Sequence, residues 1–319
     1  MMSDATWSAG TASAASGQKA RGVLPVPGTG LEMPITLING ARPGPAALVT
    51  AGVHGGEYPG IEAAIRLARD LDPGQVNGRV AVVHIYGISA FHARQQYLVP
   101  EDGKNPNRVF PGRATGTVSE RMAATLMETL AAGANAWVDL HGGDIHEALE
   151  PFTIYSDGAA PDVVAKSRAM AEAFGIPNII VSQSIAGGTY GVAASRGVPA
   201  ILAEAGGVGQ LDEGNVAILL RGARNVLRLL GVTPGTPEPM PPANFMSKFV
   251  WLRSEHTGCW YPSVRDGERV TEGQIIGVIK SYWGDVVAEH RAPASGVVLF
   301  VVTSLAINPT DPLVGIGVT

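Results

Sequence analysis

The sequence predicts an α/β fold with a mixed, largely parallel sheet and flanking helices, followed by a small all-β domain. Two observations lead to this prediction. Up to residue 232, short apolar runs alternate with segments of helical periodicity. After a proline-rich stretch, short β-type runs between glycine and aspartate turns continue to residue 319. At roughly 150 residues per domain, the chain length agrees with a division in two.

The expected elements follow one another from residue 46 onwards. Short apolar runs predict strands over residues 46–51, 79–86, 136–140, 152–155, 178–181 and 199–203. Apolar residues that recur every three or four positions predict helices over residues 60–71, 119–132, 162–174 and 213–230. Between them, residues 89–118 are rich in Gly, Pro and Asn. A loop of that length inside a compact domain is usually functional.

Composition divides the chain into four parts. Residues 1–22 are rich in Ala, Ser, Gly and Thr without an apolar core, which indicates a disordered tail and not a signal peptide. Residues 23–232 carry the alternating pattern of the α/β domain. Residues 233–243 contain five prolines and are expected to be a linker, and residues 244–319 are expected to form the β-domain.

The β-domain contains a weak internal repeat with an offset of 38 residues, because the runs that begin at Gly258 and end at Val278 recur at Gly296 and Ile316. Two such units joined by a hairpin resemble the barrel-sandwich hybrid of biotinyl and lipoyl domains. A carrier domain of that kind needs a lysine at the hairpin tip. Residues 281–285 at this tip contain none, and Lys280 precedes them. A carrier function is therefore not expected.

Charge and composition exclude several classes of partner. The net charge of -5 argues against nucleic acid, which needs a basic patch. No apolar stretch approaches the roughly 18 residues of a membrane span, so no membrane partner is expected. The single cysteine, Cys259, cannot form an internal disulfide, and with the absence of a signal this favours a cytoplasmic location.

The first polar motif is HGGE at residues 54–57, directly after an expected strand. Zinc binds imidazole nitrogen and carboxylate oxygen, so His54 and Glu57 are suitable ligands. Two intervening glycines permit the tight turn that would bring both side chains to one ion. A lone histidine and glutamate at this spacing are also common in surface turns.

A second histidine motif, DLH at residues 139–141, ends another expected strand. Open α/β sheets bind ligands at the carboxyl ends of their strands, so His141 would supply a third zinc ligand. Asp139 could hold a histidine ligand by a hydrogen bond. Three protein ligands leave a fourth position for water, which is the pattern of a catalytic zinc. The sequence therefore predicts one zinc ion per chain.

Glu204 ends the last expected strand and precedes two glycines. A carboxylate beside water that zinc activates can accept a proton and return it to the leaving group. The alternative is a capping or surface glutamate, but the preceding apolar strand favours the catalytic role.

The long loop contains NPNRVFPG at residues 105–112. The planar guanidinium of Arg108 matches a substrate carboxylate, and Asn107 offers a neighbouring amide. Loop arginines are usually solvated, whereas the dense Asn, Pro, Phe and Gly setting indicates that this one is held in place.

As a set and in this order, these motifs resemble the succinylglutamate desuccinylase/aspartoacylase family, a branch of the zinc carboxypeptidase superfamily, from about residue 30 to the end of the chain. The resemblance implies zinc ligands at His54, Glu57 and His141. It also implies that Glu204 is the general base and acid, and that Asn107 and Arg108 bind a substrate carboxylate.

One position departs from the family pattern. Many members carry an arginine just before the aromatic residue at the position of Tyr97, where it helps to polarise the scissile carbonyl. This chain has Gln96 there and Arg94 two residues earlier. Arg94 is the candidate catalytic residue for that role, if the chain is shifted by two residues relative to the family pattern. The alternative is that the role is absent.

These inferences lead to the hypothesis of a zinc-dependent hydrolase that cleaves the amide bond of a small N-acyl amino acid or a related N-acylated compound. Alternatives are a metallocarboxypeptidase acting on short peptides, a hydrolase of esters, and a non-catalytic ligand-binding protein on the same scaffold. The expected partner is a small molecule with a carboxylate. The sequence does not determine the acyl group or the amine of the substrate. It also leaves the oligomeric state open, and a homo-oligomer is one possibility.

Overall fold

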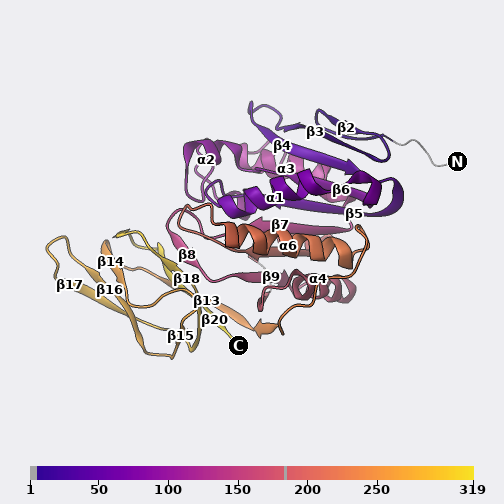
Figure 1. Ribbon diagram of the computed structural model, residues 1–319. Coiled ribbons are helices and arrows are strands. Elements are labelled where there is room, and N and C mark those ends of the chain that lie inside the picture. The colour runs from indigo at the N-terminus through magenta and orange to yellow at the C-terminus, as the bar shows by residue number, and fades with distance from the viewer. Residues whose placement is uncertain (1–5, 183–184) are drawn as a thin grey trace.

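A nine-stranded mixed sheet forms the centre of the computed structural model, which describes residues 6–182 and 185–319 (Figure 1). The strand order is β12-β10-β9-β11-β7-β5-β6-β4-β3. In chain order these are β3 (Gln18–Pro25), β4 (Glu32–Asn39), β5 (Arg42–Ala51), β6 (Asn77–Val83), β7 (Ala136–His141), β9 (Phe152–Ser156), β10 (Asn178–Ser182), β11 (Ala200–Glu204) and β12 (Asn244–Met246). Neighbours pair in parallel except β9/β11, β6/β4 and β4/β3. The predicted mixed, largely parallel sheet is confirmed.

Helices cover both faces of this sheet. One face carries α1 (Tyr58–Asp70), α4 (Pro161–Phe174) and α6 (Glu213–Leu229), and the other carries α3 (Val118–Thr129) and α5 (Thr189–Ser195). Connections contain α2 (Ile88–Ala93) and the 3₁₀ turns η1 (Pro73–Gln75), η2 (Pro106–Arg108) and η3 (Ala131–Gly133). Within the described ranges, none of the helices has the length and apolar character needed to cross a membrane.

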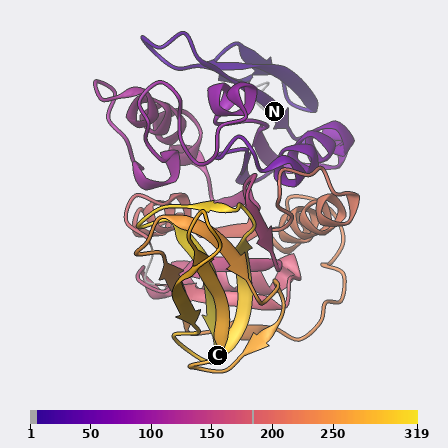
Figure 2. The same ribbon diagram turned by 90° about the vertical axis from the view of Figure 1, so that its left-hand side faces the viewer.

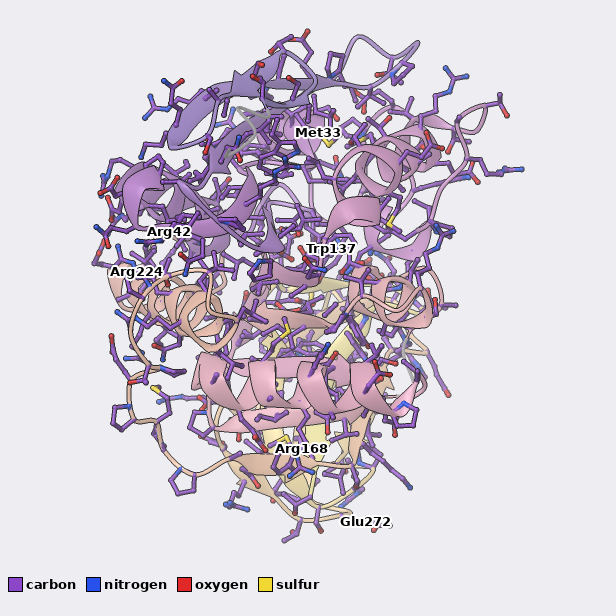
Figure 3. All side chains as sticks on the ribbon, turned by 90° about the vertical axis from the view of Figure 1, so that its right-hand side faces the viewer. Met33, Arg42, Trp137, Arg168, Arg224 and Glu272 are labelled. Atoms are coloured by element: carbon purple, nitrogen blue, oxygen red, sulfur yellow. The ribbon has the colours of Figure 1, made fainter. Side chains whose placement is uncertain are left out.

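Local sequence explains the central elements. All six residues of β7 are buried, as expected for a strand covered on both faces. Trp137 of this strand lies in the middle of the molecule, whereas Arg42, Arg168 and Arg224 lie at its periphery (Figure 3). At the start of α3, the carboxylate of Glu120 accepts a hydrogen bond from the backbone amide of Thr117 at 2.8 Å. This contact satisfies the amide of the residue that precedes the helix.

The N-terminal region differs from the sequence prediction. A hairpin of β1 (Trp7–Ala9) and β2 (Ala12–Ala14) precedes β3, and Ala9, Ala12 and Ala14 pack into the main core. The predicted disordered tail over residues 1–22 is therefore wrong for residues 7–22, while residues 1–5 lie outside the described chain. A segment rich in alanine and glycine gives little indication of a strand in the sequence. The small size of these residues nevertheless permits the close packing found here.

The C-terminal region forms two antiparallel sheets, in agreement with the predicted all-β fold. One contains β13 (Lys248–Arg253), β20 (Pro312–Val318), β18 (Gly296–Val302) and β15 (Arg269–Val270); the other contains β17 (Val286–Arg291), β16 (Ile275–Lys280), β14 (Gly258–Pro262) and β19 (Ala306–Ile307). Trp260, Val298 and Leu313 belong to the core that they share. The Lys280 ammonium lies 4.8 Å from the centre of the Tyr261 ring, at the end of β16 and not at the hairpin tip.

The C-terminal sheets are joined to the central sheet by strand pairing. After the proline-rich segment, β12 pairs in parallel with β10 at the edge of the central sheet. In the other direction, β8 (Glu147–Leu149) pairs with β18. Figure 2 shows the C-terminal sheets in front of one end of the central sheet. A domain boundary at residues 233–243 stays a prediction.

Candidate active site

Three adjacent parallel strands carry the predicted zinc ligands and Glu204 at their carboxyl ends. His54 and Glu57 lie in the turn between β5 and α1, His141 is the last residue of β7, and Glu204 is the last residue of β11. The register of β7 and β11 places Glu204 directly beside His141. Because parallel strands end at the same edge of a sheet, residues from distant parts of the sequence meet there.

Two glycines allow the turn between β5 and α1 to approach its neighbours closely. A Cβ atom on Gly55 would lie 2.2 Å from the backbone nitrogen of Phe91, and one on Gly56 would lie 2.2 Å from Asp144 Oδ1. No side chain fits at either position. The turn therefore depends on the absence of side chains between His54 and Glu57.

The histidine and glutamate side chains form a compact set of metal-binding atoms. One such atom from each of His54, Glu57 and His141 lies within 4.8 Å of the other two. His54 Nδ1 is 2.7 Å from Glu57 Oε1, and His141 Nδ1 is 2.9 Å from Glu57 Oε2. The Nε2 atoms face Asn105 Oδ1 at 3.0 Å and Asp139 Oδ2 at 2.9 Å. Hydrogen bonds therefore orient both rings and leave their Nδ1 atoms for a metal.

The charges of this cluster also fit a divalent cation. Burial alone would raise the pKa of Glu57, but the two adjacent histidines outweigh it and lower this pKa to about 2. Burial opposes protonation of His141, whereas Glu57 and Asp139 raise its pKa well above the ordinary value. Two imidazoles and an ionised carboxylate form a donor set that suits zinc.

Asp139 connects His141 to a buried hydrogen-bond network. Its Oδ1 accepts from the Thr50 hydroxyl at 2.5 Å, and its Oδ2 accepts from the Thr189 hydroxyl at 2.5 Å. The indole of Trp137 donates to the Thr50 hydroxyl at 2.7 Å. These contacts fix Asp139, which in turn fixes the ring of His141.

Glu204 extends beside this cluster as a candidate proton carrier. Its Oε2 is buried and has no hydrogen-bond partner among the described residues. Burial raises the pKa of Glu204 well above the ordinary value, and the carboxylates of Glu57 and Glu147 add to this increase. A carboxyl group in such surroundings can hold a proton between two steps of a reaction.

Asn107 and Arg108 belong to η2 and line the same cavity as Glu204. The backbone amide of Thr189 donates to Asn107 Oδ1 at 2.9 Å, which leaves the side-chain NH₂ group to bind a ligand. The Arg108 guanidinium donates to the Asn107 carbonyl at 2.7 Å. Burial lowers the pKa of Arg108, and the described residues provide no carboxylate in ion-pair contact with it. A carboxylate ligand would supply that partner.

The cavity has a volume of about 390 Å³, within the usual range for small ligands. The central sheet and its loops provide the polar side chains described above. The C-terminal strands provide the remaining wall through Phe249, Trp251, Arg253, Phe300 and Pro312. The rings of Phe249 and Phe300 are 6.0 Å apart, and both contact Trp251. The C-terminal region therefore closes one side of the site.

Three further polar residues of the site were not identified from the sequence. Asn105 contacts His54, as described above, and the Tyr97 hydroxyl donates to Glu147. Burial raises the pKa of Glu147 to about 7. Asn105 is part of the NPNR motif, so its role could have been predicted from the sequence. Tyr97 was noted only as the aromatic residue of the family pattern, and Glu147 belongs to no recognisable motif. The fold brings both to the cavity.

Arg94 lies outside this cavity. It is exposed, has a left-handed backbone with φ of 53° at the end of α2, and lines a separate depression with Gln96 and His146. Tyr97, three residues further along the chain, lines the cavity instead. The structure thus brings together six of the seven predicted site residues and leaves Arg94 apart.

Comparisons with known proteins agree with this geometry. Residues 43–230 match the model of the succinylglutamate desuccinylase/aspartoacylase catalytic domain. N-α-acetyl-L-2,4-diaminobutyric acid deacetylase from Halomonas elongata is 33% identical over 275 residues, which cover 83% of this chain and 79% of that protein. The product-bound ectoine utilization protein EutE (DoeB) from Ruegeria pomeroyi has a TM-score of 0.85 at 29% identity, over 95% of both chains. A succinylglutamate desuccinylase/aspartoacylase from Rhodobacter sphaeroides has a TM-score of 0.80 at 30% identity, over 93% of this chain and 94% of that one.

Proposed function

Because this chain belongs to the succinylglutamate desuccinylase/aspartoacylase family, we propose that it is a zinc-dependent deacylase that hydrolyses the amide bond of a small N-acyl amino acid. One observation carries the proposal. Glu204 and the group of His54, Glu57 and His141 share a cavity with an arginine that has no carboxylate partner in the described chain.

In this proposal each group of the cavity has a distinct task. Zinc held by His54, Glu57 and His141 would polarise the scissile carbonyl and lower the pKa of water. Glu204 takes the proton from the attacking water and delivers it to the amide nitrogen, which leaves as an amine. The unpartnered, buried Oε2 of Glu204 and the raised pKa of its carboxyl group support this role.

Arg108 and Asn107 orient the substrate. The guanidinium of Arg108 binds the α-carboxylate of the amino acid, and the amide NH₂ of Asn107 adds a second donor. A fixed carboxylate places the neighbouring amide bond next to Glu204, which turns binding energy into orientation. The wall provided by Phe249, Trp251 and Phe300 favours a small acylated amino acid over a peptide.

The test is hydrolysis of a panel of N-acetyl, N-succinyl and other N-acyl amino acids by zinc-loaded protein. We expect turnover of at least one member. The variant Glu204→Gln should keep its zinc and lose about a hundredfold or more in kcat. Glu128→Gln, at an exposed position of α3, is the matched control and should behave like the wild type.

Two results would contradict the proposal in different ways. A wild-type protein that binds no zinc would show that the metal assignment is wrong. A Glu204→Gln variant with unchanged turnover would remove Glu204 from the reaction and leave the metal assignment intact.

A further inference from the structure

We infer that Glu147, held by Tyr97, binds a cationic group on the side chain of the substrate, so that the enzyme prefers N-acyl amino acids with a short, positively charged side chain. This inference rests on the proposed deacylase function. It identifies the substrate class from the carboxylate of Glu147, which has no role in the proposed hydrolysis.

Glu147 is buried without a cationic partner. It is 8% exposed, lines the cavity and receives one side-chain hydrogen bond, from the Tyr97 hydroxyl. No Lys, Arg or His of the described residues forms an ion pair with it. Glu57, also buried, has two histidine partners. Because a buried carboxylate is costly unless it is paired, a cationic ligand is its natural partner.

The backbone of Glu147 is fixed before any ligand binds. Its carbonyl accepts from the Val208 amide at 2.9 Å, and β8 is paired with β18. Cβ atoms on Gly143 and Gly207 would lie 2.6 and 2.0 Å from the Glu147 carbonyl oxygen, so the chain packs tightly around this residue. The ring of Tyr97 packs edge-on against His54 at 5.8 Å, which also holds its hydroxyl in place. The carboxylate is thus preorganised.

Glu147 and Arg108 have different electrostatic neighbours. Those of Glu147 are Asp144, Glu57 and His54, whereas those of Arg108 are Tyr190, Arg253 and Glu204. Glu147 and Glu57 are also electrostatic neighbours of Glu204, so Glu204 lies near both Glu147 and Arg108.

Three groups of the cavity can each contact a different substituent of one α-carbon of the substrate. Arg108 binds the carboxylate, the acylated nitrogen lies at Glu204, and the side-chain ammonium reaches Glu147. An acidic side chain would instead face the carboxylate of Glu147 and be repelled. The chemistry fits the relative from Halomonas elongata, whose name gives a diaminobutyric acid derivative as its substrate.

The experiment compares two substrates of nearly equal shape. N-α-acetyl-L-2,4-diaminobutyrate carries an ammonium group where N-acetyl-L-norvaline carries a methyl group. Acetate release gives kcat/KM for both with zinc-loaded protein. We expect the wild type to prefer the charged substrate by about 10- to 100-fold, as expected for a hydrogen-bonded charge pair. Glu147→Gln should lose most of this preference, because its loss on the diaminobutyrate derivative should exceed its loss on the norvaline derivative by about tenfold or more.

Glu150→Gln is the matched control, because Glu150 lies near the end of β8 but does not line the cavity. It should keep the wild-type preference. Zinc content of each variant is measured in parallel. Equal losses on both substrates in Glu147→Gln would overturn the inference and assign Glu147 to the metal environment.

Measurements on the wild type test the inference even if Glu147→Gln does not fold. The wild type should cleave the N-acetyl derivatives of aspartate and glutamate at least about 100-fold more slowly than that of diaminobutyrate. Equal rates would overturn the inference while the deacylase function stands. Absence of turnover with every N-acyl amino acid would instead refute the proposed function itself.

Discussion

Thr189 connects His141 with Asn107, one residue from each of the two proposed binding groups of the site. Its hydroxyl donates to Asp139, which orients His141, and its backbone amide donates to the side chain of Asn107. The residue is fully buried at the start of α5. A change at this position should therefore affect the orientation of His141, a proposed metal ligand, through Asp139.

Replacement of Thr189 by valine should weaken zinc binding by about tenfold, because it removes a hydrogen bond to the partner of a metal-bound histidine. Competition with a chromophoric chelator measures this affinity. Thr189→Ser keeps the hydroxyl and should bind zinc like the wild type. If Thr189→Val also retained wild-type affinity, Asp139 would not depend on this hydroxyl for its orientation.

At the residue scale, sequence reasoning identified the groups that lie in motifs at strand ends or in the NPNR segment. His54, Glu57, His141 and Glu204 follow the rule that ligands gather at the carboxyl ends of parallel strands. Arg94 was chosen by analogy with a neighbouring position, but it is exposed at the end of α2 and lines a depression outside the cavity. Glu147 was missed, because nothing in its local sequence distinguishes it from a solvated glutamate.

At the element scale, α4 and α6 lie side by side on one face of the sheet because a glycine permits their contact. A Cβ on Gly222 of α6 would lie 2.2 Å from Cε1 of Phe174 at the end of α4. Phe174 is fully buried, so its ring has little space to move. Close approach of the two helices thus depends on this one position.

The substitution Gly222→Ala should lower the free energy of unfolding by about 1–3 kcal/mol. Overpacking against Phe174 costs about this much and exceeds the gain of about 1 kcal/mol from the higher helix propensity of alanine. Urea denaturation measures the change. Gly214→Ala, at an exposed position of the same helix, meets only Asp212 and should be neutral or slightly stabilising. A stabilising effect at position 222 would contradict the packing argument.

The sequence predicted the elements with strong periodicity and missed the weaker ones. The residues of α6 that face the sheet recur at helical spacing, which predicted this helix. All six residues of β7 are buried, and their mostly apolar run predicted this strand. In contrast, β1 and β2 are three residues long and consist of small side chains, and β4 contains Pro34. Proline weakens the local signal of a strand, so that only pairing with β3 and β6 identifies β4.

At the scale of the whole molecule, the central and C-terminal sheets share apolar contacts as well as strand pairs. Phe249 on β13 lies 5.6 Å from the ring of Phe152 on β9 and 6.0 Å from that of Phe300 on β18. Met246 and Leu299 are fully buried in the main core. Both regions are therefore expected to unfold together, because part of the apolar surface of each is buried against the other.

Phe249→Ala should lower the free energy of unfolding by about 2–4 kcal/mol and keep a single transition. Far-ultraviolet circular dichroism and tryptophan fluorescence should report the same midpoint in a denaturant titration. Tyr282→Ala is the control, since Tyr282 is 74% exposed at the hairpin tip and should contribute little. Two separate transitions would show that the C-terminal region folds independently.

The sequence by itself determined the fold class, the histidine motifs at the strand ends and the family, because each of these depends on the local order of residues. Apolar periodicity marks a strand or helix wherever it occurs, and a histidine at a strand end has a defined place in a parallel sheet. The tertiary structure decided which residues of the long loop reach the cavity. It also decided that β8 and β18, far apart in the sequence, pair and that Glu147 lines the same cavity as His54, Glu57 and His141. Contacts of this kind depend on chain reversals and long-range pairing, for which the local sequence carries no signal.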